Sequence, residues 1–249
     1  MERVDRYKAA LDAARPFQGD VLKELRDYYK IGLTWSSNAI EGNTLTITET
    51  KVVLEDGLTV GGHPLRELYE TAGHGAAYDY MRSLTGNKSV TIEDIKTMHR
   101  LFYERIDSRN AGVWRDRPVF VTGSDYVFPS PEEIPAKMSE LETWAASERG
   151  RLHPVEFAAL LHLKFVLIHP FVDGNGRTGR LLMNLVLLQD GYQIAIIPPV
   201  CRMEYLSAIR HYELRGDSKI FVEFIAGRVE ESEKEIMRLL RIEDKGGKS

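Results

Sequence analysis

One segment constrains the fold of this 249-residue chain more than any other. Residues 153–169, HPVEFAALLHLKFVLIH, are apolar on nearly every side, and Pro170 follows at once. A helix that is apolar all round is typical of the buried centre of a domain. Because proline disfavours helix in the residue before it and cannot donate into an α-helical ladder, this central helix is predicted to end near His169.

Helical periodicity dominates the rest of the chain. Further helices are predicted over residues 20–33, 46 or 48 to 57, 67–84, 91–106, 130–148, 177–190 and roughly 218–241. One segment departs from this pattern: PVFVTGSDYVF at 118–128 carries β-branched and aromatic residues on both sides of Gly-Ser-Asp, which is typical of a β-hairpin. The predicted fold class is mainly α, a single helical domain with one hairpin.

Composition narrows the class of protein. A hydrophobic content of 43% and a charged content of 28% are ordinary for a globular protein, and the net charge of −4 gives no support for a general nucleic-acid binder. The single cysteine, Cys201, excludes an intramolecular disulfide and fits a reducing compartment. The charged N-terminus does not resemble a signal peptide, and no apolar stretch reaches the roughly 20 residues that span a bilayer. We therefore expect a soluble cytoplasmic protein that binds neither nucleic acid nor membrane.

The twelve residues 169–180, HPFVDGNGRTGR, hold most of the chemistry that the sequence reveals. The glycines at 174 and 176 let the backbone turn tightly, and a helix is predicted to start near Arg177. Backbone donors at a helix N-terminus form an anion site, and arginines add forked donors that suit phosphate. Asp173 would repel a bare anion there unless a divalent cation lies between its carboxylate and the phosphates. With His169 as a base, the segment suggests nucleotide chemistry.

Simpler interpretations of these residues exist. A lone histidine beside apolar residues is more often structural, and Asp173 would also serve as an N-cap or Asx-turn residue. Arg177 and Arg180 are three residues apart and so lie on one helix face. In the first turn of a helix the macrodipole disfavours cations by a few tenths of a kcal/mol or more, so two arginines there imply an anionic partner. The segment matches neither a Walker loop nor a dinucleotide-binding turn. A zinc site at the histidines is disfavoured because His162 and His169 are seven residues apart.

The twelve-residue segment resembles the signature of the Fic (Fido) family, whose members transfer AMP from ATP to hydroxyl side chains of proteins. The resemblance extends over roughly residues 30–235 and is especially close to class II Fic domains, including that of the metazoan endoplasmic-reticulum enzyme. It is carried by RLHPVEFAALLHLKFVLIHPF, by RLLMN and by the later IIP…Y…GD pattern. It implies a Fic-type helical bundle over 30–241, after a helical extension at 1–29 and before a flexible tail at 242–249. We therefore expect neither the tetratricopeptide repeats nor the membrane anchor of the metazoan enzyme in this chain.

The resemblance also implies roles for individual residues. His169 matches the catalytic base, Phe171 the aromatic residue that anchors the loop in the core, and Asp173 the Mg²⁺ ligand. The implied nucleotide-binding residues are Asp173, Gly174, Asn175, Gly176, Arg177, Thr178, Gly179, Arg180 and, by weaker similarity, Tyr205. Among these, Arg180 matches the arginine that holds the γ-phosphate. Gly179 stands where the metazoan enzyme has serine, a position at which the family varies. The hairpin at 118–128 resembles the flap that covers the nucleotide and aligns a target segment by strand addition.

A second short motif lies in the N-terminal third of the chain. Residues 37–42, SNAIEG, resemble the inhibitory [ST]-x-x-x-E-[GN] helix of the family, with Ser37, Glu41 and Gly42 at the motif positions. The simpler interpretation is a helix end with Gly42 as the C′ residue. Under the family interpretation, Glu41 pairs with Arg180 and withdraws it from the γ-phosphate.

These features predict a self-inhibited protein adenylyltransferase. It would transfer AMP from ATP, with Mg²⁺, to a Ser, Thr or Tyr hydroxyl of a protein, itself included, and release pyrophosphate. A homo-oligomer is compatible with this prediction. Two alternatives stay open: removal of AMP with Glu41 positioning water, and a non-enzymatic, nucleotide-gated regulatory protein. Phosphoryl transfer as in the Doc branch is disfavoured, because that branch usually has lysine where Gly176 stands here.

Overall fold

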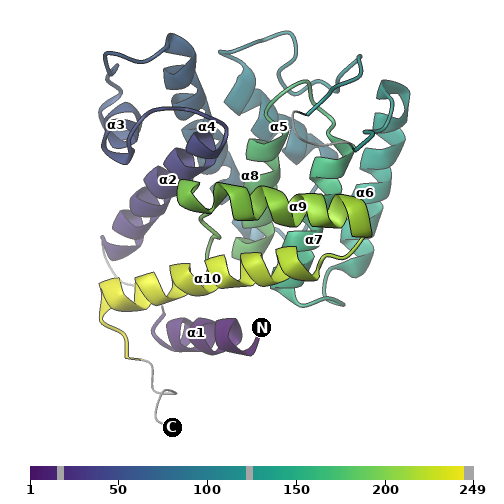
Figure 1. Cartoon of the computed structure of the whole chain (residues 1–249). Coiled ribbons are helices and arrows are strands. Elements are labelled where there is room, and N and C mark those ends of the chain that lie inside the picture. Colours follow the sequence, from purple (N-terminus) through teal and green to yellow (C-terminus); the bar gives the residue numbers. More distant parts are fainter. Residues whose placement is uncertain (16–19, 122–125, 244–249) are drawn as a thin grey trace.

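A computed structural model describes residues 1–15, 20–121 and 126–243 (Figure 1). In chain order the α-helices of this part are α1 (Glu2–Ala13), α2 (Val21–Ile40), α3 (Ile47–Lys51), α4 (Leu65–Ser83), α5 (Ile92–Tyr103), α6 (Ile134–Glu148), α7 (Pro154–Ile168), α8 (Asn175–Gln189), α9 (Arg202–Arg215) and α10 (Lys219–Leu240). A π-helical turn, Val52–Asp56, follows α3. Within the described ranges no helix is long and apolar enough to cross a membrane.

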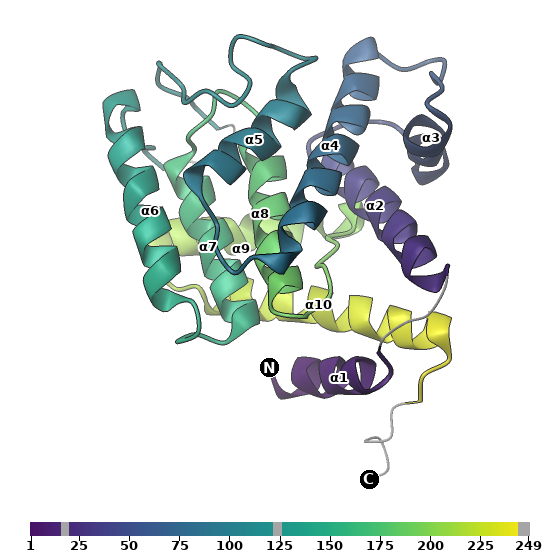
Figure 2. The ribbon, with the colours of Figure 1, turned by 180° about the vertical axis from the view of Figure 1, so that it is seen from behind.

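Helices α7 and α8 form the centre of the bundle. They pack against each other, and α7 also contacts α6, α9 and α10, while α8 contacts α2, α4 and α5. In Figure 1 α10 crosses in front of the lower part of the central pair and α1 lies beneath α10; Figure 2 shows α4 and α5 on the opposite side of the bundle. The prediction that residues 153–169 form a central buried helix is therefore confirmed.

The predicted boundaries of the central helix are also close to the observed ones. Nδ1 of His153 accepts a hydrogen bond from the Val155 backbone N–H at 3.2 Å, and Pro154 occupies the first turn. At the other end the helix stops at Ile168, and His169 is the C-cap in the left-handed conformation, with φ 51° and ψ 57°. The helix thus ends where Pro170 was expected to end it.

The next helix begins earlier than the sequence predicted, at Asn175 rather than near Arg177. The Asn175 side chain accepts from the Phe171 N–H at 2.9 Å and donates to the Phe171 carbonyl at 2.8 Å, which closes the loop before it. The sharp turn is therefore made by Gly174 alone, with φ 76°. A Cβ atom there would lie 2.9 Å from Cε1 of Phe102, so both the conformation and the space require glycine.

Two helical predictions differ from the structure for physical reasons. Helix α2 continues past the predicted end at residue 33 to Ile40, because Ser36 and Ser37 are buried polar residues rather than the start of a surface loop. Helix α9 is absent from the prediction. It buries only Tyr205 and Ala208, so its sequence has almost no apolar periodicity to detect.

The predicted β-hairpin at 118–128 is not supported. The described residues contain no strand, and the turn of the expected hairpin, residues 122–125, lies outside them. The flanks are instead held by the guanidinium of Arg115, which donates to the carbonyl of Arg117 at 3.0 Å and to that of Pro129 at 2.5 Å.

Candidate active site

His169 lies at the junction between the two central helices. Its Nδ1 is 3.2 Å from the Val166 carbonyl, and its own carbonyl accepts from Nε of Arg115 at 2.8 Å. A ring that donates through Nδ1 keeps the lone pair on Nε2. Burial lowers the pKa of His169 to about 4, and the charge of Arg115 acts in the same direction. At neutral pH the imidazole is therefore uncharged, with Nε2 able to accept a proton.

The loop after His169 is fixed by aromatic packing. Phe171 is fully buried, as predicted for a loop anchor, and stacks on the ring of His99 with centroids 3.6 Å apart. Nε2 of His99 is 3.0 Å from the Asp173 carbonyl, while its Nδ1 accepts from the Gly112 N–H at 2.9 Å. These bonds fix the tautomer of His99 and hold the backbone that leads into α8.

Arg180 is buried, and all three of its guanidinium nitrogens have partners. Nε donates to Ser37 Oγ at 2.9 Å, and one terminal nitrogen donates to the Ser37 carbonyl at 2.8 Å and to Glu41 Oε1 at 2.7 Å. The other terminal nitrogen donates to the Tyr205 hydroxyl at 3.3 Å. The structure thus brings Arg180 to Ser37 and Glu41, which lie about 140 residues earlier in the chain, and the Glu41–Arg180 pair is the one that the family resemblance implied.

The Glu41 carboxylate also lies directly over the first turn of α8. A Cβ atom on Gly176 would be 2.4 Å from Glu41 Oε1, so glycine at this position makes room for the carboxylate. The first N–H groups of a helix have no intrahelical acceptor and attract anions. Burial raises the pKa of Glu41, but the charges of Arg180 and Arg177 outweigh it and hold this pKa below its usual value. Glu41 is therefore ionised and occupies the predicted anion site.

A cleft beside Glu41 is also lined by Arg177. This arginine is buried, and not all of its N–H groups have hydrogen-bond acceptors. Its guanidinium carbon lies 4.3 Å from the centre of the Phe102 ring, and one terminal nitrogen is 3.2 Å from Glu70 Oε1. That approach lacks hydrogen-bond geometry, and Nε and the same nitrogen are buried without a hydrogen-bond acceptor. Buried donors without acceptors are costly, so an oxygen-rich anion in the cleft would be stabilised by Arg177.

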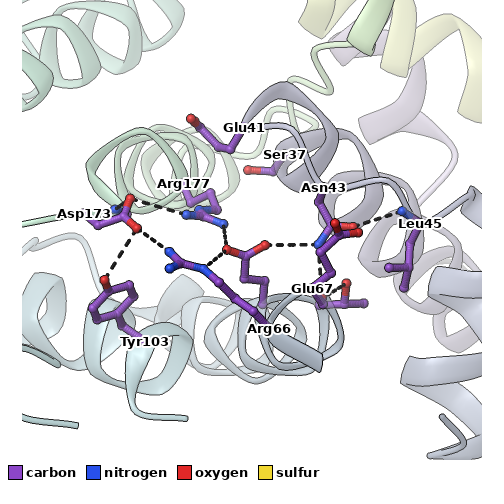
Figure 3. A network of polar contacts seen from close by, with 12 residues as sticks. Ser37, Glu41, Asn43, Leu45, Arg66, Glu67, Tyr103, Asp173 and Arg177 are labelled. Carbon is purple, nitrogen blue, oxygen red and sulfur yellow. Dashed lines mark hydrogen bonds and ion pairs between the residues drawn. The ribbon is translucent and has the colours of Figure 1, made fainter. Parts of the chain in front are cut away.

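Asp173 stands at the mouth of this cleft, and its side chain is 41% exposed (Figure 3). Oδ2 accepts from Arg66 at 2.7 Å and Oδ1 from the Gly174 N–H at 2.6 Å. Arg66 also donates through Nε to Glu70 at 3.2 Å. Sequence reasoning missed Arg66 and Glu70. Their i, i+4 spacing was visible, although the helix predicted over 67–84 left Arg66 just outside it, and no local signal connected them with residue 173.

One carboxylate at the edge of a cleft fits the way in which Mg²⁺ binds in phosphate sites, where one or two carboxylates, several waters and the substrate phosphates supply the ligands. Among the residues that the structure describes, no group of three or more His, Cys, Asp and Glu side chains is arranged to hold a metal by itself. Asp173 therefore fits an ion that arrives with a polyphosphate rather than a resident metal centre.

The remaining predicted site residues lie on the core side of α8. Thr178 and Arg180 are buried, and a Cβ on Gly179 would be 3.0 Å from the ring of His162. The Tyr205 hydroxyl is 2.9 Å from Nε2 of the same histidine, and the tyrosine is 2% exposed beneath Arg180. Tyr205 therefore supports Arg180 from the core, since its hydroxyl accepts a hydrogen bond from the guanidinium. The cleft itself has a volume of about 370 Å³ and is lined by Glu41, Gly42, Asn43, Pro64, Arg66, Glu67, Glu70, Asp173 and Arg177.

The site thus combines an uncharged histidine at the end of one central helix with a glycine turn and two buried arginines at the start of the next. Residues 89–187 match the model of the Fic/DOC family. The chain belongs to this family: it is 31% identical to the solved structure of Fic-1 from C. elegans, with a TM-score of 0.86, covering 96% of this chain and 72% of that one.

Two other comparisons agree with this assignment. The structure of a Fic domain-containing signaling protein from Bacteroides thetaiotaomicron has a TM-score of 0.89 at 28% identity and covers 99% of this chain and 100% of that one. The Drosophila melanogaster protein named protein adenylyltransferase Fic is 37% identical over 234 residues, which is 93% of this chain and 47% of that protein. The chain thus spans about half the length of the curated relatives that it matches.

Proposed function

We propose that this protein is a self-inhibited protein adenylyltransferase that transfers AMP from ATP to a Ser, Thr or Tyr hydroxyl. The observation that carries the proposal is the Glu41 carboxylate, which lies on the first turn of α8 and on Arg180, where the phosphates of a nucleotide would otherwise bind. The name of the D. melanogaster relative supports the same reaction.

The proposed reaction assigns a separate task to each group. Nε2 of His169 takes the proton of the target hydroxyl, whose oxygen attacks the α-phosphorus of ATP. The new bond joins this oxygen to phosphorus, the bond between the α-phosphorus and the bridging oxygen to the β-phosphorus breaks, and pyrophosphate leaves. The first-turn N–H groups of α8, Arg177 and Arg180 hold the phosphates. Asp173 would hold Mg²⁺, whose chemistry is to neutralise charge on the phosphate oxygens.

The target side chain would approach past the segment around residues 118–128. Phe120 and Val127 are 94% and 88% exposed, and Phe128 packs on His169 with ring centroids 4.6 Å apart. Exposed apolar side chains close in the chain to Phe128, which contacts the predicted base, offer a surface for a bound polypeptide. This supports a protein rather than a small molecule as the acceptor.

The position of the label separates AMP transfer from other nucleotide reactions. We expect the Glu41→Gly variant to become labelled, or to label a protein in a lysate, when ATP carries the label on its α-phosphorus. ATP labelled on the γ-phosphorus is expected to leave no label on protein, because that phosphorus departs in pyrophosphate. Label from the γ-position alone would indicate phosphoryl transfer and contradict the proposal. Release of AMP from a modified protein by the wild type, but not by Glu41→Gly, would instead identify the reverse, AMP-removing activity.

The low pKa of His169 predicts an unusual pH profile. Because burial lowers this pKa to about 4, from an ordinary value of 6.5, the free enzyme keeps the uncharged base over the whole neutral range. Loss of the Glu41 charge lowers this pKa further, since that charge raises it. For Glu41→Gly we expect kcat/KM to show no histidine titration between about pH 5 and pH 8, because kcat/KM reports the groups of the free enzyme. Initial rates in overlapping buffers measure this, and a midpoint near 6.5 would refute the assignment of His169 as a buried neutral base.

A further inference from the structure

The turn that carries Glu41 is tied to α4 by the two residues Asn43 and Thr44. Nδ2 of Asn43, a residue only 9% exposed, donates to the Glu67 carbonyl at 3.1 Å and to Glu70 Oε2 at 3.2 Å (Figure 3). The N–H of Thr44 donates to Glu67 Oε2 at 2.7 Å. The inhibitory turn is therefore held by a second helix as well as by the end of α2.

The side-chain amide of Asn43 performs two separate tasks. Its oxygen accepts from the Leu45 N–H at 3.1 Å, a local bond of the Asx-turn type. Its nitrogen makes both of the bonds that cross to α4. Substitutions that remove only the nitrogen can therefore distinguish a link between helices from local turn formation.

The Glu70 carboxylate, which accepts one of these bonds from Asn43, strengthens the link between the turn and α4 and lies beside the cleft. Glu70 is 7% exposed, and its Oε1 faces Arg66 and Arg177 while its Oε2 faces Asn43. A buried carboxylate needs donors, and hydrogen bonds to a charged acceptor are stronger than neutral ones. When Asn43 moves away from α4, the carboxylate loses one of its donors, which opposes that motion.

We propose that Asn43 is a positioning residue for Glu41: its side-chain nitrogen latches the inhibitory turn to α4 and so keeps the Glu41 carboxylate on Arg180. The inference rests on the proposed inhibition by Glu41 and adds what holds the inhibitory residue in place. A looser turn lets Glu41 leave Arg180 more often, and ATP, which binds the state with Arg180 free, then shifts the population toward it.

Two substitutions of Asn43 test the latch. Asn43→Asp keeps the size of the side chain and an oxygen for the Leu45 N–H, but it removes the donor and places a carboxylate beside Glu70. Asn43→Ala removes both the local hydrogen bond to the Leu45 N–H and the two bonds to α4. We expect each variant to bind ATP about tenfold more tightly than the wild type and to transfer AMP about tenfold faster, with Asp at least as effective as Ala. In the Glu41→Gly background neither substitution should tighten ATP binding or speed transfer further, because no Glu41 carboxylate remains to be released.

A matched control comes from the far end of α8. Nε2 of Gln189 also donates to two backbone carbonyls, those of Leu84 at 3.1 Å and Ser89 at 3.2 Å, and the residue is 6% exposed. We expect Gln189→Ala to lower the melting temperature while it leaves ATP affinity unchanged. If Gln189→Ala tightens ATP binding as much as Asn43→Asp does, general loosening explains the effect and the latch is refuted.

The remaining outcomes are equally decisive. An Asn43→Asp variant that binds ATP like the wild type would restrict Asn43 to its local turn and overturn the proposal. Tighter ATP binding by Asn43→Asp that persists in the Glu41→Gly background would do the same, because the latch acts only through Glu41. ATP affinity, measured by calorimetry, does not depend on transfer. If no variant transfers AMP, the proposed function fails while the binding data still decide on the latch.

Discussion

Replacing Glu41 by glycine is expected to raise the rate of AMP transfer by about two orders of magnitude. Under the proposed inhibition the nucleotide displaces Glu41 from Arg180, to which it is joined by a charge-assisted hydrogen bond of 2.7 Å; the arginine is buried, while the Glu41 side chain is 36% exposed. Displacing such a bond costs about 2–3 kcal/mol, which corresponds to roughly 30- to 150-fold in rate. Initial rates of label incorporation from α-labelled ATP measure the change.

A matched variant separates the charge of Glu41 from its shape. Glu41→Gln keeps an oxygen that can accept from Arg180 but loses the negative charge, so its rate is expected to lie between those of wild type and Glu41→Gly. Removal of the carboxylate also leaves the buried Arg180 without its counter-charge, which destabilises the fold. We therefore expect Glu41→Gly to melt at a lower temperature than the wild type, and ATP to restore part of the loss. A Glu41→Gly variant no faster than the wild type would contradict inhibition by Glu41.

The sequence was most informative where one physical pattern determined one element. The apolar surface of residues 153–169 and the proline after them predicted both the position and the end of α7. Glycine spacing and paired arginines predicted an anion site, and the Glu41 carboxylate lies on the first turn of that helix. In each case the residues that determine the structure are neighbours in the chain.

The predictions that were wrong or incomplete concern residues whose structure depends on contacts outside their own segment of the chain. Helix α2 was predicted only over residues 20–33, yet it continues to Ile40, and Ser37 in this continuation is buried where it binds Arg180, 143 residues away. The contact of Arg66 with Asp173 spans 107 residues and left no local pattern. The expected hairpin at 118–128 had the residue types of strands, but Arg115 binds the carbonyls at its flanks. Local sequence patterns are therefore least reliable where contacts between distant residues at the functional site determine the local structure.

Substitution of His169 by alanine in the Glu41→Gly background is expected to lower transfer by about 10³-fold, because the loss of a general base typically costs 10²- to 10⁴-fold. ATP affinity is expected to stay within about twofold, since the phosphates are assigned to α8, Arg177 and Arg180, and the only hydrogen bond of the His169 ring goes to the Val166 carbonyl within the described residues. Single-turnover rates and calorimetry of the same two variants test both parts.

A second histidine at the other end of the same helix provides the control. His153 caps α7 and is 2.9 Å from Asp5, and it takes no part in the proposed reaction. His153→Ala is expected to lower the melting temperature and to leave the rate within about twofold. If His169→Ala keeps a tenth or more of the activity, a group other than His169 accepts the proton. If it instead loses ATP binding, the histidine acts in nucleotide binding, and the division of tasks between His169 and α8 is wrong.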